Sequence, residues 1–92
     1  MRKTYRPVDK KMDQLYYRKL ANHLVENSQL RTELISSKTE SPIEYNVYAN
    51  NTKCAIRLTS ETVTVHGENS DDIRRTVSAL EGSGILLKEV EF

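Results

Sequence analysis

Hydrophobic and polar positions follow two different periods along this chain, and each period predicts its own kind of secondary structure. Before residue 36, a seam of mostly apolar positions recurs every three or four residues, at Met12, Tyr16, Leu20, His23, Asn27, Leu30 and Leu34. This spacing places all of these side chains on one face of an α-helix. Pro7 and Asp9 supply a start signal, so the pattern predicts a long helix from Asp9 to about Ile35.

This predicted helix is long for a chain of 92 residues. At about 1.5 Å per residue it would measure roughly 40 Å, more than the width of a domain of this size. Two outcomes fit the pattern. Either the helix breaks near Asn27 and Ser28, whose side chains compete for backbone hydrogen bonds, or one end projects and packs against something else. The Ser-, Thr- and Lys-rich stretch from Ser36 to Pro42 is predicted to be a linker.

After Pro42 the alternation has a period of two, which is typical of half-buried strands. Three such runs follow one another, at Ile43–Ala49, Cys54–Thr59 and Thr62–His66. Polar pairs separate the runs, Asn50-Asn51 and Ser60-Glu61, and asparagine tolerates the positive φ that tight turns need. The sequence therefore predicts a three-stranded antiparallel meander.

A second helix and a last strand are predicted in the final quarter of the chain. Asn69 or Ser70 followed by two aspartates is a helix start, because short polar acceptors satisfy free amides and carboxylates match the helix dipole. An apolar stripe follows it at Ile73, Val77 and Leu80, and Gly82 and Gly84 end it. The last residues, Ile85–Phe92, alternate like a strand.

These elements, in the order α-β-β-β-α-β, predict a two-layer α+β fold with both helices over one face of the sheet. Residues 1–92 are predicted to form a single domain, with residues 1–8 as a flexible basic arm. The polar positions of the strands would then share the uncovered face of the sheet, namely Glu44, Tyr48, Arg57, Thr59, Thr62, Thr64 and His66. Such a face is either solvated or a flat patch for docking.

The distribution of charge is uneven. Residues 1–31 carry eight basic and three acidic side chains, a net charge of +5, whereas the other 61 residues carry six basic and ten acidic ones, a net charge of −4. The predicted partner-binding residues are the basic side chains of the arm and helix together with one tyrosine: Arg2, Lys3, Arg6, Lys10, Lys11, Arg18, Lys19 and Tyr17. Arginine offers forked donors to phosphate, and tyrosine stacks on bases. A solvated basic face and an acidic protein partner remain alternatives.

His23 and Asn27 are the polar members of the predicted helical seam. Buried without partners, their polar atoms would each cost about 1–3 kcal/mol. One explanation is that they bond to each other, to the sheet or to water. A second is that they mark the seam of a homodimer, where a buried polar residue fixes register. A third is that they belong to a site for a ligand or a partner protein.

Catalytic, metal-binding and cofactor-binding motifs are not found in the sequence, so we expect no catalytic residues, no metal and no cofactor. Cys54, the one cysteine, is predicted to lie on the inward face of a strand as a small buried hydrophobe. A lone cysteine forms no internal disulfide, and the basic N-terminus is followed by no apolar run or cleavage signal. These features favour a cytoplasmic protein.

Together the features predict a small non-enzymatic regulatory or inhibitory binding module. It would act sterically on a nucleic acid or nucleoprotein through the basic arm and first helix. The alternative is a protein-binding inhibitor or adaptor that docks on an acidic protein surface, for example a phage-type protein that disables a host factor. No membrane association is expected, and a homodimer is an open prediction.

Overall fold

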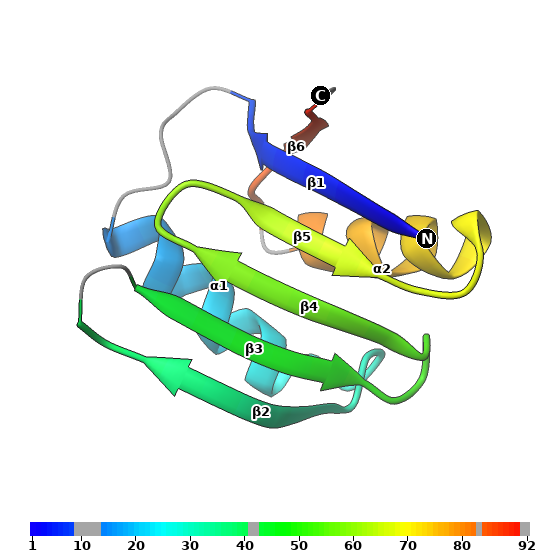
Figure 1. The fold of residues 1–92 in the computed structure, drawn as a ribbon, viewed down its shortest axis with the longest axis horizontal. Coiled ribbons are helices and arrows are strands. Elements are labelled where there is room, and N and C mark those ends of the chain that lie inside the picture. The colour runs from blue at the N-terminus through cyan, green and yellow to red at the C-terminus, as the bar shows by residue number, and fades with distance from the viewer. Residues whose placement is uncertain (9–13, 41–42, 83, 91–92) are drawn as a thin grey trace.

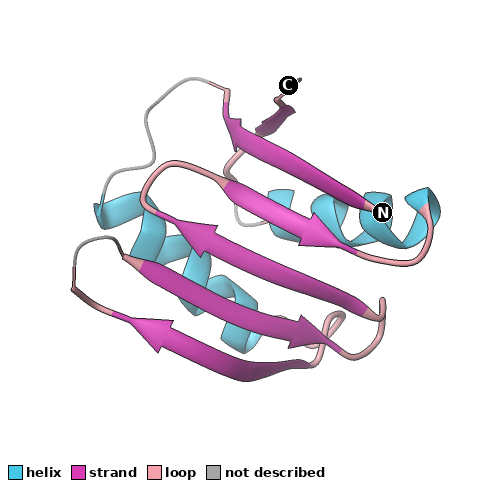
Figure 2. Ribbon diagram, viewed as in Figure 1, coloured by secondary structure: helices cyan, strands magenta, loops and turns pink. Residues whose placement is uncertain are grey.

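One antiparallel sheet of six strands and two helices make up the described part of the computed structural model, which covers residues 1–8, 14–40, 43–82 and 84–90 (Figures 1 and 2). In chain order the elements are β1 (Arg2–Pro7), α1 (Gln14–Glu26), β2 (Thr32–Lys38), β3 (Glu44–Ala49), β4 (Cys54–Thr59), β5 (Val63–His66), α2 (Ser70–Glu81) and β6 (Leu87–Glu89). Across the sheet the order is β2-β3-β4-β5-β1-β6. Both helices lie on the same side of the sheet, behind it in Figure 1.

The predicted meander is confirmed as β3, β4 and β5. Ile56 at the centre of β4 lies opposite Val47 of β3 and Val65 of β5, and all three side chains are buried. Their neighbours along each strand point away from the helices, so the alternation in the sequence matches the pleat of the sheet.

The N-terminal segment is not the flexible arm that the sequence predicts. Its residues form β1, which pairs with β5 on one side and with β6 on the other. Tyr5 is the one large apolar side chain of this strand that points inward, and it is 9% exposed. A single inward apolar residue among charged neighbours gives too weak a local pattern to predict a strand. With β1 at the start of the chain, the predicted α-β-β-β-α-β order is wrong.

The first helix is shorter at its C-terminal end than predicted. It ends at Glu26, where the Asn27 Oδ1 accepts a hydrogen bond from the Gln29 amide at 2.9 Å. Arg31 then takes a positive φ of 48°, which turns the chain back toward the sheet. The break near Asn27 and Ser28 is therefore the first of the two outcomes that the pattern allowed. The predicted start of this helix at Asp9 lies outside the described residues.

Residues 32–38 form β2 rather than the end of a helix and a linker. Leu34 fits the helical spacing of the sequence, yet it lies opposite Val47 in the β2–β3 pair. The hydroxyl of Thr32 donates to the Leu24 carbonyl at 2.7 Å, which ties the start of this strand to the end of α1. Pairing with β3 thus overrides the helical period.

The second helix is confirmed, since α2 begins after Asn69, whose side chain accepts a hydrogen bond from the Asp72 amide at 2.9 Å. The predicted last strand is present in part. It spans Leu87–Glu89 and pairs with β1, while Glu91 and Phe92 lie outside the described residues.

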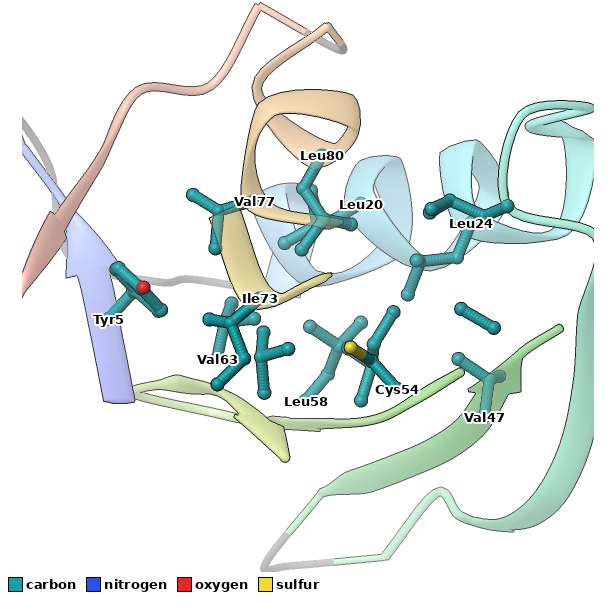
Figure 3. Close-up of a cluster of buried hydrophobic side chains, with 14 of the residues drawn as sticks. Tyr5, Leu20, Leu24, Val47, Cys54, Leu58, Val63, Ile73, Val77 and Leu80 are labelled. Carbon is teal, nitrogen blue, oxygen red and sulfur yellow. The ribbon is translucent and has the colours of Figure 1, made fainter. Parts of the chain in front are cut away.

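The hydrophobic core fills the space between the helices and the sheet (Figure 3). Leu20 and Leu24 of α1 and Leu80 of α2 have no exposed surface, and they face the valines, Ile56 and Leu58 of the strands. Burying a leucine or isoleucine side chain stabilises a fold by about 1.5–3 kcal/mol. This packing fixes the side of the sheet that the helices cover and leaves the other side open.

Gly67 connects β5 to α2 in a space that has no room for a side chain. A Cβ placed there would lie 2.8 Å from the Cys54 Sγ and 3.3 Å from Cγ1 of Ile73, both of which are buried. We predict that Gly67→Ala lowers the free energy of unfolding by about 1–3 kcal/mol, because overpacking forces buried groups apart. Urea denaturation measures this loss.

Two further variants test the cause of that loss. Glu68→Ala, at the neighbouring exposed position, should change stability little. In a Gly67→Ala/Cys54→Ala variant the loss should be smaller than the sum of the two single losses, because the thiol that blocks the new methyl group is gone. A Gly67→Ala protein as stable as the original would contradict the packing described here.

Candidate nucleic-acid interface

The face of the sheet opposite the helices is open to solvent in the described structure. In β5, Val63 and Val65 are buried under the helices. Because side chains alternate along a strand, Thr64 and His66 point to the open side. The same alternation places Glu44 and Tyr48 of β3 on this side. The polar face predicted from the sequence is therefore present.

Strand β1 adds basic residues to this face. Arg2 lies opposite His66 and Thr4 opposite Thr64, with the two threonine hydroxyl oxygens 3.3 Å apart. Tyr5 points the other way, into the core, where burial and the carboxylates of Glu89 and Glu81 raise the pKa of its phenol. The strand thus separates its apolar residue from its arginines by simple alternation.

The basic side chains gather on the β5-β1-β6 half of the open face. Arg6 of β1 lies directly opposite Lys88 of β6, and Arg2 lies on the same strand and the same face, separated from Arg6 by Thr4. Among the described residues, no carboxylate comes within 4.0 Å of the charged nitrogens of these three side chains, since the ion pairs lie elsewhere. Their positive charge therefore faces solvent.

A hollow of about 350 Å³ extends along the open face. Its lining runs from Ile35 of β2, past Asn46 and Arg57, to His66 of β5 and Arg2 of β1. Three strands separate β2 from β1, a distance of roughly 19 Å at the usual strand spacing. This one hollow therefore crosses five neighbouring strands of the open face, from β2 to β1.

The β3-β4 part of the open face is electrically balanced. Arg57 of β4 donates to a carboxylate oxygen of Glu44 at 3.0 Å, and Asn46 donates to the other oxygen, also at 3.0 Å. These hydrogen bonds, first from Asn46 and then from Arg57, lower the pKa of Glu44 below its ordinary value. The carboxylate stays ionised and neutralises Arg57, so the excess positive charge lies toward β1 and β6.

The structure divides the predicted basic surface instead of bringing it together. Arg2 and Arg6 lie on the open face, but Lys3 points toward the helix side, with its Nζ 4.0 Å from a carboxylate oxygen of Glu89. Arg18 and Lys19 are exposed on α1, in the layer on the other side of the sheet. Lys10, Lys11 and the side chain of Tyr17 lie outside the part of the chain that the structure describes.

Lys88 also belongs to the basic surface, although the sequence alone does not predict it. Its neighbour across the sheet, Arg6, is 82 positions away in the chain, and no local pattern shows that the two strands pair. The alternation of Arg2, Thr4 and Arg6 around Tyr5 is the one signal in the sequence that indicates a basic strand face here.

His23 and Asn27 face α2 and join the two helices. The His23 Nε2 lies 2.9 Å from the carbonyl oxygen of Ala79 and 3.2 Å from the Asn27 Nδ2. The Asn27 Nδ2 also donates to the same carbonyl at 3.3 Å. The two side chains thus contact each other, as the first explanation expects. They also contact the end of α2. Their role in a homodimer seam stays a prediction.

The residues considered for chemistry are kept apart by the sheet. The Cys54 thiol is fully buried on the helix side and donates to the Thr52 carbonyl at 3.3 Å, whereas His66 is exposed on the open side. Within the described ranges, no group of three or more His, Cys, Asp or Glu side chains is placed to hold a metal ion.

Comparisons with protein-family models, with curated proteins and with solved structures find no match to this chain. Neither of the two described helices has the length and apolar character needed to cross a membrane.

The lowered pKa of Glu44 can be tested by carboxyl NMR titration. We predict that Glu44 titrates below the ordinary glutamate range and that Asn46→Ala raises its pKa, since the hydrogen bond that lowers this pKa most is lost. Because the pKa of Glu44 is lower in the folded state than in the unfolded state, its ionised carboxylate stabilises the fold at pH values above the unfolded-state pKa. This contribution disappears as the pH falls through the lowered folded-state pKa. Asn22→Ala, an exposed asparagine on α1, is the matched control. An unchanged Glu44 midpoint in Asn46→Ala would contradict the described contact.

Proposed function

We propose that this chain is a small non-enzymatic binding module that docks on a nucleic acid or nucleoprotein with the open face of its sheet. The observation that carries the proposal is the pair formed by Arg6 and Lys88, which lie directly opposite each other on that face; among the described residues no carboxylate oxygen comes within 4.0 Å of their charged nitrogens. Like charges in direct cross-strand register destabilise a sheet by about 0.2–1 kcal/mol. A bound anion relieves that repulsion.

Phosphates are the anions that this arrangement suits best. The side chains of Arg2, Arg6 and Lys88 point outward from two adjacent strands, and arginine offers a forked pair of donors to a phosphate. Successive phosphates of an extended strand can meet such a row of cations, and the hollow beside Arg2 has room for part of the polymer. Tyr48, 36% exposed on the same face, is available to a base.

The mechanism is steric. The described open face offers hydrogen-bond donors and cations to a polymer, while the residues weighed for catalysis lie on opposite sides of the sheet. Occupying a nucleic acid or nucleoprotein surface blocks other proteins from it, which is how a small regulatory or inhibitory module acts without chemistry of its own.

The salt dependence of binding tests this proposal. Three phosphate contacts predict that the logarithm of the affinity for a labelled single strand of about 12 nucleotides falls with log salt at a slope of about −2. Arg2→Gln/Arg6→Gln should weaken binding by about 10- to 100-fold and reduce the slope to about −1. Fluorescence anisotropy at several salt concentrations measures both quantities.

A matched control has the same change in charge on the other layer. Arg18→Gln/Lys19→Gln removes two cations from α1, and it should leave affinity and slope nearly unchanged if the open face is the contact surface. Equal losses in the two double variants would mean that binding follows net charge and not this face. Affinity that does not vary with salt would reject phosphate contacts altogether.

A protein-binding inhibitor or adaptor is the second candidate. The observation in its favour is the apolar part of the hollow, where Ile35, 60% exposed, and Ala55 lie beside the basic residues. Protein interfaces combine apolar contacts with charge complementarity. A partner retained from nuclease-treated lysate by the original chain but not by Arg2→Gln/Arg6→Gln, with no single-strand binding, would favour this candidate.

A further inference from the structure

Strand β2 forms one edge of the sheet, with β3 on its inner side and no described strand on its outer side. It is seven residues long, whereas β6 at the other edge has three. An open edge presents a row of backbone N–H and C=O groups that can pair with another strand. Two large apolar side chains lie on this edge, Leu34 and Ile35, each 60% exposed.

A bulge in β2 changes which residues share a face. In the pairing with β3, Leu34 lies opposite Val47 and Ser36 lies opposite Asn46, so Ile35 is the extra residue. In a regular strand, residues separated by an odd number of positions point to opposite faces. The bulge shifts this alternation by one position for the residues that follow it.

As a result, the two charged residues of β2 point to the same face. Glu33 lies opposite Tyr48, and Lys38 lies opposite Glu44. Tyr48 and Glu44 are four positions apart on β3, so Glu33 and Lys38 both belong to the open face. Within the described residues, neither of them forms an ion pair.

The charges of this strand are complementary to those of the same strand running in the opposite direction. If a second copy of β2 lies antiparallel beside the first, with a twofold axis between Ile35 and Ser36, Glu33 of each copy faces Lys38 of the other.

We propose that two copies of this chain associate through β2, strand beside strand, into a continuous antiparallel sheet. The interface is isologous, because each residue pair occurs twice about the axis, so association stops at two copies. Ile35 of both copies lies next to the axis on the open face, and Leu34 lies opposite Ser37 of the other copy on the helix side. Because the edge and its charges are separate from the basic half of the face, this inference does not depend on the proposed nucleic-acid contact.

Charge reversal at the two positions provides the test. Analytical ultracentrifugation of the full chain from about 1 μM to about 1 mM should show a monomer–dimer equilibrium. Glu33→Lys alone, or Lys38→Glu alone, places like charges opposite each other twice per dimer and should weaken association by about tenfold or more. The double variant Glu33→Lys/Lys38→Glu restores opposite charges and should dimerise like the original chain.

Mixing the two single variants is a sharper form of the same experiment. Each should be largely monomeric by itself, yet an equimolar mixture should form a heterodimer, because the lysines of one chain then face the glutamates of the other. Glu61→Lys in the β4–β5 turn has the same change in charge away from the edge and should leave the dimer intact. Circular dichroism confirms that each variant is folded.

Two results would overturn the proposal. One is an original chain that remains monomeric over the whole concentration range. The other is a dimer that neither single reversal weakens, which would place the contact on another surface, such as the one around His23 and Asn27.

Discussion

The pairing of the N-terminal strand with β5 is the constraint on which the rest of the structure depends. It places β1 between β5 and β6, and the backbone of Met1 both accepts from and donates to Gly67 at 2.9 and 2.8 Å. Because Tyr5 is buried in the core, the alternation of side chains along β1 places Arg2 and Arg6 on the opposite side of the sheet. The basic surface is therefore a consequence of where one apolar side chain is buried.

Electrostatics on the open face follow from the same pairing. Where β3 and β4 meet, a carboxylate and an arginine are in contact, and the local charge is balanced. Where β1 and β6 meet, two cations are in direct register instead. Like charges in cross-strand register destabilise a sheet, so the Arg6–Lys88 pair does not stabilise this half of the face.

Local signals predicted those elements whose neighbours are close in the chain. Asn69 with the aspartates after it marked the start of α2, and strict alternation marked β3, β4 and β5. Strands β1 and β2 were missed for different reasons. β1 has only Tyr5 as an inward apolar residue, and Leu34 of β2 fits a helical spacing by coincidence, although Asn27 ends the helix before it.

The candidate site shows the same limit. The uneven charge predicts Arg2 and Arg6 as binding residues, but it groups them with Arg18 and Lys19, which lie in the other layer. Lys88 was not selected, because only the non-local pairing of β1 with β6 brings it beside Arg6. Composition indicated an excess of basic residues near the start of the chain, but which of them share a surface depends on strand order, which period and spacing do not specify.

The central claim is that β1, inserted between β5 and β6, presents the contact surface on the open face. Amide chemical-shift mapping of the ¹⁵N-labelled chain during titration with a single-stranded oligonucleotide tests it most directly. The account predicts that the perturbed amides cluster on β1, β5 and β6. Perturbations concentrated on α1, or none at saturating oligonucleotide, would contradict it.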